Sequence, residues 1–292
     1  NRTVQTVLEP GVYWMFDPLK KREVQVYDLN NVEFMHPQKD FIVKLCSTLC
    51  EQFFTVVDVN SHQVGLLYLD EVLSGILEPG SRHLFWKQGK AVRVELLDIQ
   101  DNPRVPDSVA RLLIRTRNTK LLNEVRNAVY AVCVAENSIG LLYVDGQLQE
   151  QLKPGIYGFW CFNREVEVKL IDQRVQMLEV SGQEILTRDK VSVRVNLSAQ
   201  YRLADAVLAD QRLSDVQAFI YRELQLVLRQ VIGTRALDVL LSEKGELDTL
   251  ILKLAKPRLS EYGLETKTIG IKDIILPGEM KTILNQVVEA EK

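Results

Sequence analysis

The clearest pattern of hydrophobic and polar positions lies in residues 183–201, QEILTRDKVSVRVNLSAQY. A charged turn at 187–190 follows the apolar pair Ile185 and Leu186. From Val191 to Tyr201 every second residue is apolar and the residues between are polar. Alternation with a period of two predicts an antiparallel strand with one buried face. Upstream the chain has the pattern of a β-rich protein, whereas helical patterning dominates from residue 204 onward.

A repeat organises the first half of the chain. Segments 7–29, 76–99 and 151–173 each contain Pro-Gly, an aromatic cluster, a charged turn, a Val-x-Val alternation and, at a nearly constant distance after the Pro, an Asp. The second and third copies also share an upstream Gly-Leu-Leu-Tyr, at 65–68 and 140–143. The offset from Gly65 to Gly140 equals that from Pro79 to Pro154, and two landmarks at one offset indicate a duplicated supersecondary unit.

Each copy has the pattern of a small β-meander. Pro-Gly favours a tight turn, because Pro fixes φ and Gly adopts positive φ. The apolar run before the turn and the Val-x-Val run after it are predicted to pair as strands. The apolar runs are Val64–Leu69 and Ile139–Val144, and the Val-x-Val pairs are Val24/Val26, Val92/Val94 and Val166/Val168.

The aromatic clusters that follow the turns have two interpretations. Aromatic side chains bury large areas, so they suit the core of a small β-module. Trp and Tyr are also favoured at a membrane interface, and this alternative applies to the first and third copies. The residues of possible membrane contact are Tyr13, Trp14, Phe16, Tyr157, Phe159 and Trp160.

Linking segments separate the copies. Residues 103–127 have helical Leu spacing and six Arg or Lys residues. These charges indicate a solvated helix face or, alternatively, a membrane-surface or subunit contact. Residues 30–51 are less regular and are predicted as a strand or a short helix.

Four helices and one strand are predicted beyond residue 204. Residues 214–217 have the form of a capping box for a helix that ends at Gly233, and a short helix covers 236–242. A third helix over about 244–262 contains Pro257, and Gly263 is a plausible C-terminal cap. A strand covers 264–276, with Thr266, Thr268, Gly270, Lys272 and Ile274 on one face. The last helix begins near Gly278, with Met280, Ile283, Leu284, Val287 and Val288 at helical spacing.

Composition narrows the class of protein. With 292 residues, 46% of them apolar, the chain can bury a substantial core. A net charge of −3 gives no basis for a nucleic-acid partner. The four cysteines have neither a disulfide nor a zinc pattern and are interpreted as small buried hydrophobes. No run of 18 apolar residues occurs, but the chain begins without Met and ends inside a helical pattern. The sequence therefore leaves open a membrane span before Asn1 and a longer helix after Lys292.

Motifs for catalysis are not found in the sequence. His36, His62 and His83 lie in unrelated contexts, without the His-Glu-x-x-His spacing. There is no Gly-x-Ser-x-Gly elbow and no Walker A motif. We therefore predict that the protein is not an enzyme and has no cofactor and no metal site.

Three motifs in the second half carry a family resemblance. They are GQEILTRDKVSVRVNLSAQYRL (182–203), LRQVIGTRALDVLLSEK (228–244) and YGLETKTIGIKDIILP (262–277). Over about residues 131–292 the chain resembles the SPFH (band 7) domain of stomatins, prohibitins, flotillins and the bacterial HflK/HflC pair. It is most similar to the stomatin or slipin branch. The first two copies of the repeat are additional to a minimal stomatin.

The resemblance implies an α+β fold in which tandem β-rich modules precede an SPFH domain and the start of a long C-terminal helix. The expected domains are a first β-repeat module (1–60), a second with its linking helix (61–130), the third repeat as first SPFH subdomain (131–203), an α/β second subdomain (204–277) and the beginning of the helix (278–292).

The resemblance also implies a function. The protein is expected to be a membrane-associated scaffold, at the cytoplasmic face of a bacterial inner membrane, that forms a large homo-oligomeric ring or cage and organises a membrane microdomain. Implied partners are membrane lipids and a membrane protease or NfeD-type protein. Expected oligomer contacts are Arg188, Asp189 and Lys190 at the lateral interface, and Met280, Ile283, Leu284, Val287 and Val288 in helix packing. The β-repeats are also similar to those of the major vault protein, which makes a soluble vault-like shell without membrane contact the alternative.

Overall fold

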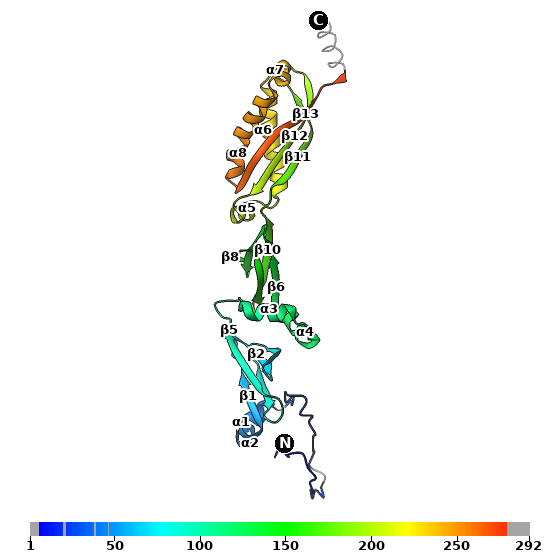
Figure 1. The fold of residues 1–292 in the computed structure, drawn as a ribbon, viewed down its shortest axis with the longest axis vertical. Coiled ribbons are helices and arrows are strands. Elements are labelled where there is room, and N and C mark those ends of the chain that lie inside the picture. The colour runs from blue at the N-terminus through cyan, green and yellow to red at the C-terminus, as the bar shows by residue number, and fades with distance from the viewer. Residues whose placement is uncertain (1–5, 20–21, 38, 46, 279–292) are drawn as a thin grey trace. The chain divides into compact units, whose positions relative to one another are not determined.

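The computed structural model describes residues 6–19, 22–37, 39–45 and 47–278 (Figure 1). Helices and small sheets alternate along these residues, and the predicted α+β class is confirmed. The chain divides into two compact units. The first comprises Asn1–Cys133, Val144–Gln147 and Ile156–Glu167, and the second comprises Val134–Tyr143, Leu148–Gly155 and Val168–Lys292. The boundaries of the five predicted domains stay predictions.

The first unit is built from short antiparallel sheets and two helix pairs. Its sheets have the strand orders β1-β4, β3-β2-β5 and β6-β9. The elements are α1 (Lys39–Leu45), α2 (Ser47–Phe53), β1 (Phe54–Asp58), β2 (Gln63–Leu69), β3 (Val72–Leu77), β4 (Arg82–Trp86), β5 (Val92–Asp98), α3 (Asp107–Arg115), α4 (Thr119–Ala128), β6 (Val129–Val134) and β9 (Gly155–Trp160).

The second and third copies of the repeat fold as predicted. In the second copy the apolar strand β2 pairs antiparallel with β3 and with the Val-x-Val strand β5. In the third copy β7 (Ser138–Val144) likewise lies between β8 (Gln147–Leu152) and β10 (Val166–Asp172). The apolar strand is therefore the central strand of each small sheet.

The first copy does not form its predicted strand. Residues 22–28 have no strand structure, and Val24 and Val26 are exposed. In the other copies the Val-x-Val strand pairs with a Gly-Leu-Leu-Tyr strand that lies upstream of Pro-Gly, whereas residues 1–9 hold no such sequence. Among the described residues, the first copy thus lacks the central strand with which its backbone would form a ladder of hydrogen bonds.

The linking segments are helical. Residues 30–51 contain α1 and the start of α2, so the short-helix alternative holds. Residues 103–127 form two helices instead of one, because the chain breaks at Thr116–Asn118. The Asn118 side chain accepts hydrogen bonds from the backbone N–H groups of Lys120 and Leu121, and so begins α4.

The second unit places helices on one face of a twisted sheet. Figure 1 shows α6 and α8 packed along the sheet, whose strand order is β11-β12-β13. The predicted face of β12 is buried against these helices, and Val193, Val195, Leu197, Ala199 and Tyr201 join the core. The elements are β11 (Gln176–Leu186), β12 (Ser192–Leu203), α5 (Ala206–Arg212), α6 (Val216–Gly233), α7 (Leu237–Ser242), α8 (Lys244–Ser260) and β13 (Leu264–Ile275).

Two local predictions in this unit are wrong. The cap of α6 is Asp215 instead of Ser214, and its carboxylate accepts from the Ala218 N–H at 2.9 Å. On β13 the simple alternation fails, since register shifts against β12 occur on both sides of residues 268–271. Such bulges turn the strand, so that Ile269 and Ile271 share the buried face with Thr266.

Three smaller predictions concern the glycine after α8, the cysteines and the last helix. The C-cap of α8 is Glu261, so the cap predicted at Gly263 was placed two residues too late. Gly263 has φ +76°, and a Cβ there would lie 2.3 Å from the Asp205 carbonyl oxygen, so the position requires glycine. Cys50 is buried, but Cys133 is exposed, which corrects the interpretation of all cysteines as core. The last predicted helix, with Met280, Ile283, Leu284, Val287 and Val288, lies outside the described residues.

Candidate functional site

The aromatic cluster of the third copy belongs to a core. Phe159 and Trp160 are 0% and 1% exposed. The backbone N–H of Trp160 donates to the Pro103 carbonyl at 2.7 Å, and the Trp160 side chain packs with residues of α3 and α4. The membrane-contact interpretation is therefore wrong for these two side chains, because both are buried within the protein.

Two neighbouring residues of this cluster, Gly158 and Tyr157, are also closely packed. A Cβ on Gly158 would meet side-chain carbons of Val129, Ala110 and Val105 at 3.3–3.4 Å, so the position has almost no room for a side chain. Tyr157 is half-buried, and the Arg104 guanidinium carbon lies 4.8 Å from its ring centroid. This cation–π contact indicates that Tyr157 also serves packing within the unit.

The aromatic cluster of the first copy is exposed. Trp14 is 98% and Phe16 87% exposed, and Tyr13 is half-exposed with its hydroxyl donating to the Glu9 carbonyl at 2.9 Å. Further exposed apolar side chains in this segment are Val12, Met15 and Leu19. The core interpretation is wrong here. Residues 12–19, which we call the aromatic segment, present an apolar surface that has the composition of an interfacial anchor.

The charged turn at 187–190 is held by hydrogen bonds from within its own unit. The Asp189 carboxylate accepts from the Thr187 hydroxyl and, at 3.3 Å, from the Leu237 N–H at the start of α7. The Thr187 hydrogen bond is the main cause that lowers the pKa of Asp189. Asp189 therefore shapes the turn, and it leaves Arg188 and Lys190 as exposed cations beside it.

The turn also lies at a defined end of the sheet. β12 begins directly after it, and Arg194 of β12 pairs in register with Ile275, at the end of β13. The exposed side chains Leu186 and Ile275 thus occur at the same end as Arg188 and Lys190. This region, the turn end, combines cationic and apolar surface directly before the segment predicted to enter the last helix.

A cluster that sequence reasoning missed joins three polar side chains of the first unit. His83 Nε2 lies 2.8 Å from Ser81 Oγ, and His83 Nδ1 lies 2.6 Å from Glu33 Oε1. Hydroxyl, imidazole and carboxylate in this order resemble an activated nucleophile. However, the Ser81 hydroxyl donates to the Glu78 carbonyl at 2.5 Å, so it accepts from His83.

This donor count assigns a structural role to the cluster. The Ser81 hydroxyl directs its proton to the Glu78 carbonyl and does not present it to the imidazole, as an activated nucleophile would. The His83 hydrogen bond is the main cause that lowers the pKa of Glu33. Glu33 and His83 are far apart in the sequence, so no local spacing could have revealed the pair, which we call the Glu33–His83 clasp.

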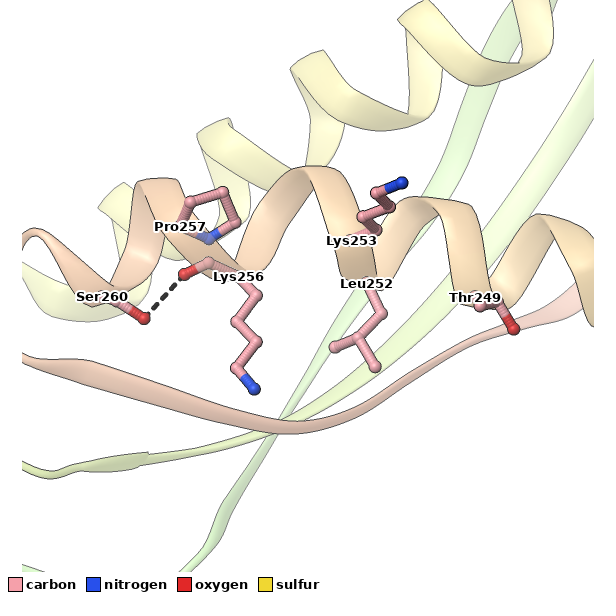
Figure 2. A pocket seen from close by; sticks show the side chains of 6 residues that line it. All are labelled: Thr249, Leu252, Lys253, Lys256, Pro257 and Ser260. Carbon is pink, nitrogen blue, oxygen red and sulfur yellow. Dashed lines mark hydrogen bonds between the residues drawn. The ribbon is translucent and has the colours of Figure 1, made fainter.

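A shallow hollow on α8 offers no reacting group. All six residues that line it come from this one helix, as Figure 2 shows: Thr249, Leu252, Lys253, Lys256, Pro257 and Ser260. The Ser260 hydroxyl is occupied, because it donates to the Lys256 carbonyl at 2.8 Å. Across the described ranges, no three His, Cys, Asp or Glu side chains gather as a metal site would require.

None of the helices within residues 6–278, apart from the undescribed positions, combines the length and apolar character needed to cross a bilayer. The candidate functional surfaces of this protein are therefore the aromatic segment of the first unit and the turn end of the second.

Comparison with known proteins defines the family. Residues 132–292 match the family described as SPFH domain / Band 7, which is more than half of the chain, and the chain belongs to this family. A stomatin homolog of Pyrococcus horikoshii is 33% identical over 123 residues, 42% of this chain and 46% of that protein. Stomatin-3 of Caenorhabditis elegans is 31% identical over 124 residues, with the same coverage of both chains. The predicted stomatin-like resemblance is thereby confirmed.

Relatives without an assigned role match over a longer stretch. An uncharacterised protein of Archaeoglobus fulgidus is 30% identical over 159 residues, 54% of this chain and 63% of that protein. The chain thus spans 46–63% of the length of these three relatives. The two first copies of the repeat lie outside the family match.

Proposed function

We propose that the protein is a membrane-associated, non-enzymatic SPFH scaffold that assembles into a large homo-oligomeric ring or cage and organises a membrane microdomain. Family membership over residues 132–292 is the observation that carries this proposal. A protease or NfeD-type protein of the membrane is the expected client, and the cytoplasmic face of a bacterial inner membrane is the expected location.

The aromatic segment is the proposed membrane contact. Tyr13, Trp14 and Phe16 are exposed together, and an unsupported apolar patch of this kind marks an interaction site. Lys20, Lys21 and Arg22 follow in the sequence, and basic residues beside interfacial aromatics favour anionic headgroups. Single exposed aromatics need no explanation, but three within four positions do.

The turn end is the proposed lateral contact between subunits. Arg188 and Lys190 are exposed at the same end of the sheet as the exposed apolar side chains of Leu186 and Ile275. Interfaces commonly combine an apolar centre with charged residues at the rim. Asp189 supports this surface indirectly, since its hydrogen bonds fix the turn. Met280, Ile283, Leu284, Val287 and Val288 remain the proposed helix-packing residues.

The experiment is negative-stain electron microscopy with mass photometry, on the protein mixed with anionic vesicles or extracted in mild detergent. We expect uniform rings or cages of many subunits at a membrane or detergent belt. Monomers or dimers would contradict assembly. Arg188→Glu should dissociate the rings, whereas the matched reversal Arg126→Glu, in the linking helix α4, should leave them intact.

The second candidate is a soluble, vault-like shell. The specific observation in its favour is that two tandem copies of the repeat fold alike, with β3-β2-β5 in one and β8-β7-β10 in the other. Tandem modules of one fold suit a wall built by repetition. The same images separate the two functions, because closed particles that ignore vesicles and carry no detergent belt would favour the shell.

A further inference from the structure

Polar side chains join the third copy of the repeat to the helix-covered sheet of the second unit. Tyr143 lies near the end of the central strand β7, and its hydroxyl donates to the carboxylate of Asp210 on α5. The Lys169 ammonium on β10 donates to both oxygens of the same carboxylate, at 3.1 and 3.2 Å. It also lies 4.9 Å from the centroid of the Tyr143 ring. These three side chains, which we call the Tyr143 latch, all belong to the second unit.

The Asp210 side of the latch is fixed on the sheet and its helices. Ala209, the preceding residue of α5, is fully buried in the core that the sheet forms with α6 and α8. The Arg212 guanidinium donates to the Glu261 carbonyl, at the end of α8, at 2.9 Å. The latch therefore connects the third copy to a helix that belongs to the sheet.

Few apolar contacts support this joint. Among the described residues of β7, β8 and β10, Ile171 alone packs against the core of the sheet and its helices. Only residues 173–175 lie between β10 and β11, and Val175 is 52% exposed. A short segment between two packed bodies is the place where a hinge absorbs changes of backbone angle.

The equivalent joint of the second copy is apolar. Tyr68 occupies the position of Tyr143, and the Arg93 guanidinium carbon lies 4.1 Å from its ring centroid. Arg93 pairs at 3.0 Å with Glu71 of its own hairpin instead of with a helix. The Tyr68 side chain packs against the core that β2 forms with α3 and α4. A buried apolar core stabilises a joint more than partly exposed polar contacts do, so the joint at Tyr143 is the weaker one.

We propose that the Tyr143 latch opens and closes, and that residues 173–175 are the hinge about which the third-copy sheet tilts when the latch is open. The structure shows the closed state. Such a joint lets the chain change the orientation of its repeat without unfolding either part. The proposal concerns a single chain, so it depends neither on assembly nor on a membrane.

The test is the distance distribution between two spin labels, measured by double electron–electron resonance. The labels are attached at Glu150→Cys of β8 and Arg222→Cys of α6, both exposed positions, in a chain whose native cysteines are replaced by alanine. Labelled chain is diluted into an excess of unlabelled chain, so that only distances within one chain are recorded.

We expect a narrow distribution with the latch intact. Asp210→Ala should widen it roughly twofold or more, because several orientations replace one. Equal widths with and without Asp210 would overturn the proposal. A broad distribution with the latch intact would overturn it as well, because the latch would then hold nothing.

Further variants separate a hinge from a loss of fold. Tyr143→Phe and Lys169→Met each remove one contact to Asp210, and each should widen the distribution less than Asp210→Ala. Exchange of the charges, Lys169→Asp with Asp210→Lys, should restore part of the narrow distribution. The control is Glu184→Ala, which removes a 2.8 Å ion pair with Arg194 inside the sheet and should leave the width unchanged.

The unfolding midpoint provides the second readout. The midpoint of Asp210→Ala should stay close to that of the chain with the latch intact, because the cores on both sides of the joint are unchanged. A broad distribution together with a clearly lower midpoint would overturn the proposal, since the cluster would then support the fold and not a hinge.

Discussion

Residues 12–16 read Val-Tyr-Trp-Met-Phe and residues 156–160 read Ile-Tyr-Gly-Phe-Trp, at the same place after Pro-Gly. The first group lies in solvent, and the last three residues of the second lie in a core. The third copy is covered by α3 and α4, and it has Gly158 where the first copy has Trp14. The comparison teaches that an aromatic pattern specifies a core only when its covering elements are present, and that one position can decide which outcome it reaches.

The largest effect is expected from removing the buried tryptophan. Trp160→Ala should lower the free energy of unfolding by about 3–5 kcal/mol, because it leaves a large cavity in the core. Trp14→Ala should change it by less than about 0.5 kcal/mol, as for most surface substitutions. Chemical denaturation measures both, and equal losses would break the comparison.

Substitutions at Gly158 and Trp14, which occupy the same place in the two copies, should have the next largest effect on stability. Gly158→Val should cost about 1–3 kcal/mol, since its side chain would press against Val129, Ala110 and Val105. The reverse change, Trp14→Gly, should be nearly neutral. Thermal unfolding of the two variants provides the measurement, and a neutral Gly158→Val would show that the tight packing is not limiting.

Trp14, the exposed residue of this comparison, should contribute to the binding of lipid vesicles. Trp14→Ala should weaken binding to anionic vesicles roughly tenfold, the equivalent of about 1.4 kcal/mol, because burial of a large apolar side chain contributes on this scale. Vesicle sedimentation gives the affinity, and Leu112→Ala, at an exposed position of α3, is the control. Equal affinity of Trp14→Ala and the parent protein would contradict the proposed contact.

The smallest expected effect concerns the Glu33–His83 clasp. Glu33 follows the first copy of the repeat in the sequence, and His83 belongs to the second copy. The hydrogen bond from His83 lowers the pKa of Glu33 in the folded protein. The ionised carboxylate therefore stabilises the fold above its unfolded pKa of about 4.3, and this contribution is lost as the pH falls through the folded pKa.

Glu33→Gln should accordingly reduce stability at pH 6 and flatten the loss of stability in acid. Denaturation between pH 6 and pH 3 tests this, with Glu136→Gln at an exposed position as the control. If Glu33→Gln kept the acid slope of the parent protein, the clasp would contribute nothing to the fold.

Local patterns predicted most of the fold, whereas features set by distant partners could not be predicted. The alternation of β12 and the apolar stripe of α6 are periodic within one element, and both elements were placed correctly. The bulges of β13 arise from its pairing with β12, so the unbroken alternation predicted for this strand was wrong.

The candidate site follows the same division. The repeat located every aromatic cluster, but exposure depends on what covers each one, which no spacing encodes. Asp189 was found as part of a charged turn, while its role at the start of α7 depends on a helix much later in the chain. The Glu33–His83 clasp joins two distant segments and had no local signal.

The most direct test of the central claim is hydrogen–deuterium exchange of the unmodified protein alone, comparing residues 12–28 with residues 156–172. Both segments carry the same repeat pattern and are measured in one sample, so intrinsic exchange rates can be matched. The account predicts fast exchange throughout 12–28 and strong protection in 156–160 and 166–172. Equal protection of the two segments would contradict it, because the first copy would then be folded like the third.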